Sequence, residues 1–99
     1  MEAMIDKEFK QNIFDYGIAA SYYYQRDIEL IKAKKLQELS MELRDKPSAW
    51  AYNDYGNILR KLGETDNAIK AYKQSLKLAE ESDNDYLIQE NQKALSEIE

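Results

Sequence analysis

The side chains best suited to bind another molecule lie close together in one short stretch of the chain. Asn53 and Asn57 are four residues apart, so on a helix they share one face, and their amides can hydrogen-bond a peptide backbone. Trp50 offers a large apolar surface, and Arg60 can pair with a carboxylate. Each has an ordinary alternative: Trp50 could cover a helix junction, the amides could belong to a solvated face, and Arg60 could pair with Glu64.

Side chains that carry out catalysis are scarce in this chain. It contains no histidine and no cysteine, which excludes the commonest general base and any thiol nucleophile. It has no glycine-rich phosphate loop, and Asp83 and Asp85 lack the central glycine that an EF-hand calcium loop needs. We therefore expect a protein that is not an enzyme, with no catalytic residue, no cofactor and no metal site.

The charge distribution argues against nucleic acids and membranes as partners. The formal net charge is −5, and residues 80–99 hold seven carboxylates and one lysine. The basic residues Lys32, Lys34 and Lys35 are typical of a solvated helix face. No apolar run is long enough to span a bilayer, and the charged N-terminus does not resemble a signal peptide. A cytoplasmic protein is the expectation.

Apolar residues recur every three or four positions along most of the chain, which predicts helices. Turn and cap signals at residues 25–27, at Pro47 with Ser48, at Gly63 and at residues 81–85 divide this pattern into five helices. No segment alternates with a period of two, so the fold class is all-α. The first two helices are expected to bury stripes made of Ile5, Phe9, Ile13, Tyr16, Ala20 and Tyr23, and of Ile28, Ile31, Leu36, Leu39 and Leu43.

Gly56 stands inside the third predicted helix, where glycine costs roughly 1 kcal/mol relative to alanine. Such a glycine is favoured where another element approaches too closely for a side chain. Residues 49–82 resemble a tetratricopeptide repeat, a helix pair of about 34 residues with small residues where the two helices touch. The resemblance rests on Tyr52, Tyr55, Gly56, Leu59, Gly63, Ala68 and Tyr72. It places Gly56 against the partner helix, near Ala68 and Tyr72.

Three positions depart from the family pattern. Trp50 lies two residues before the position at which the family prefers tryptophan, which Tyr52 occupies. Ser75 replaces an alanine, and Glu80 stands where a proline would fall.

Two weaker copies flank this repeat. Residues 13–46 repeat its spacing at an offset of 36, with Lys32 at the position of Ala68. Within the central repeat, Thr65 or Asp66 is expected to cap the helix that follows Gly63. In the last helix, over residues 84–99, Leu95 aligns with Tyr55 at an offset of 40. Residues 1–99 are therefore expected to form one domain, an α-α solenoid of two and a half helix pairs capped by the last helix; an ordinary helical bundle is the alternative.

The resemblance implies a noncatalytic module that binds a protein or peptide in the concave groove of the array. The first helix of each pair lines that groove in this family. A structural or self-association module, dimerising or stacking through its end helix, is the alternative. The groove residues expected to contact a ligand are Phe14, Tyr24, Trp50, Asn53, Asn57 and Arg60.

Overall fold

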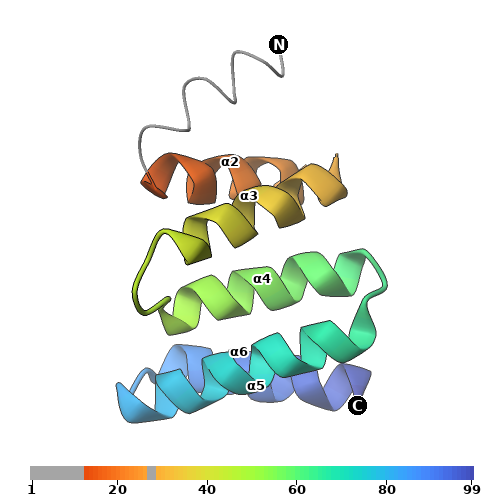
Figure 1. Ribbon diagram of the computed structural model, residues 1–99. Coiled ribbons are helices and arrows are strands. Elements are labelled where there is room, and N and C mark those ends of the chain that lie inside the picture. The colour runs from red at the N-terminus through yellow and green to blue at the C-terminus, as the bar shows by residue number, and fades with distance from the viewer. Residues whose placement is uncertain (1–12, 27–28) are drawn as a thin grey trace. The chain divides into compact units, whose positions relative to one another are not determined.

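The computed structural model describes residues 13–26 and 29–99, and these residues form five helices and no strand. The all-α prediction is confirmed, and adjacent helices pack in pairs as in a tetratricopeptide-like repeat. The chain divides into two compact units, residues 1–46 and residues 47–99 (Figure 1). The predicted core positions Ile5, Phe9 and Ile28 lie outside the described residues.

The first unit contains the helix pair α2 (Ile13–Gln25) and α3 (Leu30–Glu42). On α2, Tyr16, Ala20 and Tyr23 are buried as predicted. On α3 the predicted stripe is wrong except at Leu36, because Ile31, Leu39 and Leu43 are exposed. The buried positions of α3 are Ala33, Leu36, Gln37 and Ser40.

The second unit contains α4 (Ala49–Lys61), α5 (Thr65–Glu81) and α6 (Asp85–Ile98). The predicted cap Ser48 accepts a hydrogen bond from the backbone N–H of Ala51, and Asn84 caps α6 through Leu87 in the same way. Gly63 follows α4 with φ of +81°, as expected for a glycine that ends a helix. The prediction for α5 is wrong: its cap residue is Glu64, without a side-chain cap bond.

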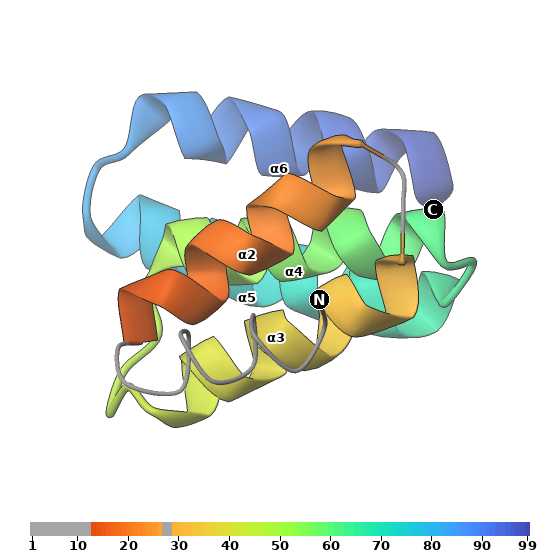
Figure 2. The ribbon, with the colours of Figure 1, turned by 90° about the horizontal axis from the view of Figure 1, so that it is seen from above.

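Consecutive helices of the second unit run antiparallel, so α4 and α6 begin at the end where α5 finishes (Figure 2). Both α4 and α6 pack against α5, and they also touch one another. One cluster of buried side chains joins all three helices: Leu59, Ala68, Ala71, Tyr72, Ala94 and Leu95. A smaller cluster of Ala49, Ala79 and Leu87 closes the other end.

The ring of Tyr72 occupies the space beside Gly56. A Cβ atom at position 56 would lie 2.9 Å from both Cδ1 and Cε1 of Tyr72, closer than carbon atoms can pack. Tyr72 is fully buried, so its ring has no free space into which to retreat. The close approach predicted for Gly56 is therefore confirmed, and the approaching group is an aromatic ring.

Replacing Gly56 with Leu should lower the free energy of unfolding of the second unit by about 2–3 kcal/mol, because the new side chain overpacks the site that Tyr72 fills. Urea unfolding followed by the fluorescence of Trp50, the one tryptophan in the chain, measures this loss.

The matched control is Lys61→Leu, which adds the same side chain at an exposed position of the same helix. This variant should change the unfolding free energy by no more than about 0.5 kcal/mol. Equal stabilities for the Gly56→Leu chain and the parent would contradict the close-contact explanation.

Candidate functional site

Asn53 points from α4 toward α6 and is buried there. Its Nδ2 donates to Oδ1 of Asn91 at 2.9 Å, and Nδ2 of Asn91 donates to Oγ of Ser75 at 2.8 Å. The Ser75 hydroxyl in turn donates to the backbone carbonyl of Ala49 at 2.7 Å. Asn91 and Ser75 are fully buried, so the three helices share a polar contact inside their core.

Asn57 extends this contact in the other direction. The Tyr72 hydroxyl donates to Oδ1 of Asn57 at 2.6 Å, and Nδ2 of Asn57 lies 3.3 Å from Oδ1 of Asn53. Five hydrogen bonds therefore follow one another from Tyr72 through Asn57, Asn53, Asn91 and Ser75 to the Ala49 carbonyl. We call this series the amide chain. No buried side-chain polar atom among the described residues is left without a partner.

The amide chain shows where the two asparagines predicted to orient a ligand are placed. Asn53 is only 9% exposed, and its amide is engaged by groups on α4 and α6. Asn57 is half-buried, with bonds to Tyr72 and Asn53. No signal in the sequence identified Asn91, the partner of Asn53, because nothing in a linear sequence pairs residues 38 positions apart. The same holds for Ser75, which bonds Asn91.

Arg60 is paired with α6. Its Nη1 lies 2.9 Å from Oε1 of Glu97, and both side chains are partly exposed. Hydrogen bonding to Glu97 raises the pKa of Arg60 above its ordinary value, outweighing the opposing effect of burial. The partner of Arg60 is therefore a residue of α6, whereas the sequence had suggested Glu64.

Trp50 forms a stacked pair with Tyr86. The ring centroids lie 5.6 Å apart and the planes differ by 24°. Trp50 and Tyr86 each occupy the second position of their helix and are 36 residues apart. The caps Ser48 and Asn84 are also 36 residues apart. The structure thus aligns α6 with α4 at an offset of 36, where the sequence had suggested 40. The pair remains 50% exposed at Trp50 and 60% exposed at Tyr86.

A carboxylate follows each ring of the stacked pair by one helical turn. Asp54 comes four residues after Trp50, and Glu90 comes four residues after Tyr86. Both side chains are accessible, yet surrounding protein displaces part of the hydration of the Asp54 carboxyl and raises its pKa to about 6.

Two of the predicted ligand contacts, Phe14 and Tyr24, belong to the first unit. Tyr24, on α2, is half-buried. The side chain of Phe14 lies outside the described residues.

The stacked pair, together with the residues that follow each ring at helical spacing on α4 and α6, forms what we call the α4–α6 face. Its members follow the helical period on each helix, with an aromatic ring first and a charged pair last. The face offers apolar area, hydrogen-bonding groups and charge; among the residues described, no three acidic side chains are grouped to hold a metal ion. It consists of Trp50, Asp54, Asn57 and Arg60 on α4, and Tyr86, Glu90, Lys93 and Glu97 on α6.

Replacing Asn91 with Ala should lower the unfolding free energy of the second unit by about 3 kcal/mol, because it leaves the Asn53 amide and the Ser75 hydroxyl without their buried partner. Urea unfolding followed by Trp50 fluorescence again provides the measurement.

The double variant Asn53→Leu/Asn91→Leu serves as the comparison for this loss. It removes both partners of their shared bond and leaves only Nδ2 of the half-buried Asn57 without its acceptor, so it should cost clearly less than the sum of the two single leucine substitutions. Additive losses would mean that the two asparagines are not coupled.

Comparison with known families identifies the central part of the chain. The model of the tetratricopeptide repeat matches residues 49–82, which are the bounds expected from the sequence and which cover α4 and α5. Neither the curated proteins nor the solved structures gave a significant match. Within the described part of the chain, no helix is long and apolar enough to cross a membrane. The matched helix pair, with the Tyr72 ring against Gly56, is therefore a tetratricopeptide repeat.

Proposed function

We propose that this chain is a noncatalytic module that binds an extended segment of another protein on the α4–α6 face. Tetratricopeptide repeats generally serve as protein-protein interaction modules. The observation that carries the proposal is the stacked pair Trp50–Tyr86, which leaves half or more of each ring exposed. Large aromatic residues held rigid at a surface are typical anchors of protein interfaces.

The other members of the face divide into direct and indirect roles. Arg60 and Glu97 are accessible and can hydrogen-bond a ligand beyond their own pair. Asn57 is half-buried, and both ends of its amide are bonded within the unit. Asn53 acts indirectly, because its bond to Asn91 holds α6 beside α4 and so keeps the two rings stacked. Phe14 and Tyr24 stay proposed contacts of the first unit.

Self-association is the second candidate function, and one observation favours it. Ile31, Leu39 and Leu43 are exposed on α3, and exposed apolar side chains along one helix can pair with a second copy. The outward residues of α6 are polar, with Gln89, Gln92 and Ser96 all exposed, and they do not favour association through the last helix.

The test is selection of peptides from a random 12-residue display library on the full chain. Peptides that are enriched should bind the Trp50→Ala/Tyr86→Ala variant at least about tenfold more weakly, because two anchor rings are lost. Circular dichroism checks that the helix content of the variant is unchanged.

The matched control is Gln89→Ala/Ser96→Ala, two substitutions on the outward side of α6. Binding to this variant should equal binding to the parent. Enriched peptides that bind the aromatic variant as well as the parent would place the binding site elsewhere. A concentration-dependent dimer in sedimentation, abolished by Leu39→Glu, would favour self-association.

A further inference from the structure

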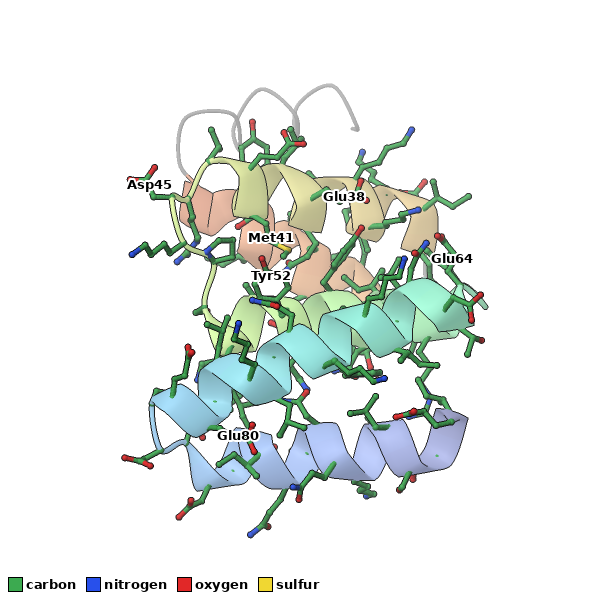
Figure 3. The ribbon with its side chains drawn as sticks, turned by 60° about the horizontal axis from the view of Figure 1, so that its bottom comes forward. Glu38, Met41, Asp45, Tyr52, Glu64 and Glu80 are labelled. Carbon is green, nitrogen blue, oxygen red and sulfur yellow. The ribbon has the colours of Figure 1, made fainter. Side chains whose placement is uncertain are left out.

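The stacked pair lies at the acidic end of the second unit. This end is made by the beginnings of α4 and α6 and the end of α5 (Figure 2). Residues 47–59 and 78–92 hold Asp54, Glu80, Glu81, Asp83, Asp85 and Glu90, and no lysine or arginine. In Figure 3, Glu80 lies near the connection from α5 to α6, whereas Glu64 lies at the opposite end.

The carboxylates that follow the two rings by one helical turn have no ion-pair partner among the described residues. The side chains of Asp54 and Glu90 form no hydrogen bond or ion pair with any other described residue. Two ion pairs of this unit lie toward the other end: Arg60 pairs with Glu97, and Lys73 lies 3.8 Å from Glu99. Negative charge beside the rings is therefore open to a ligand.

At the beginnings of α4 and α6, a side-chain cap occupies one of the backbone N–H groups that could attract an anion. Backbone N–H groups at a helix start attract anions when they are free. Here Ser48 caps α4 and Asn84 caps α6 by accepting such bonds, and Asp85 adds a carboxylate in the first turn of α6. An acidic partner would meet repulsion at this end.

We propose that the Trp50–Tyr86 pair receives an arginine side chain of a basic partner segment, with Asp54 and Glu90 as its counter-charges. A guanidinium group stacks on the face of an aromatic ring and donates hydrogen bonds from its edge to carboxylates. The exposed rings and the two unpartnered carboxylates one turn further on supply both kinds of contact. This inference rests on the proposed function and specifies the chemistry of its partner.

The experiment uses three fluorescein-labelled nine-residue peptides in a glycine-serine background, which carry three arginines, three citrullines or three glutamates. Fluorescence anisotropy with the full chain measures their affinities at low salt. The citrulline peptide keeps the shape of arginine without its charge, so it should bind at least about tenfold more weakly than the arginine peptide. The glutamate peptide should not bind.

Variants of the chain locate the contact. Asp54→Asn/Glu90→Gln should weaken the arginine peptide about tenfold, since two counter-charges are lost. The matched control, Glu64→Gln/Asp66→Asn, changes the net charge equally at the opposite end of the unit and should leave the affinity unchanged. Equal weakening by both variants would show diffuse charge attraction and overturn the inference, as would equal binding of the citrulline peptide.

The peptides selected by display separate this inference from the proposed function. Selected peptides that are rich in arginine and depend on Trp50 and Tyr86 support both. Selected peptides that depend on the two rings but are neutral or acidic leave the proposed function standing and overturn the basic partner. Selected peptides that ignore the rings overturn both.

Discussion

The contact between Gly56 and the ring of Tyr72 determines how the second unit is built. Because position 56 has no side chain, α5 can approach α4 closely enough for the Tyr72 ring to occupy the space beside it. That approach brings the Tyr72 hydroxyl to the side-chain Oδ1 of Asn57, where the amide chain begins. The chain then crosses to α6 through Asn53 and Asn91. One missing Cβ thus controls the position of all three helices.

The amide chain links the interior of the unit to its proposed binding face. Asn91 fastens α6 beside α4, and this placement sets Tyr86 against Trp50 and Glu97 against Arg60. The side-chain amides of Asn53 and Asn57 on α4, which were expected to bind a ligand, form hydrogen bonds inside the unit. What remains for a partner is the aromatic pair and the charges around it.

Much of the fold could be predicted from the sequence because the signals are local. The caps and turns at Ser48 and Gly63 depend on residues within one helical turn, and the spacing of small residues identified the central repeat. The prediction failed on α3, where the buried residues Ala33 and Ser40 match Ala68 and Ser75 at an offset of 35. The connection before α3 is one residue longer than the connection before α5, and periodicity alone does not reveal such a shift.

The site was predicted less well because its contacts join distant residues. Ser75 looked like a defect in the repeat pattern, yet its hydroxyl completes the amide chain that an alanine could not form. A buried apolar seam would hold α6 as firmly, but leucines tolerate a slip of one helix along another, whereas paired amides bond in one register only. Register matters here, since a slip of one turn would separate Tyr86 from Trp50 and Glu97 from Arg60. The amide chain therefore holds α6 in one register against α4 and keeps the residues of the α4–α6 face in alignment.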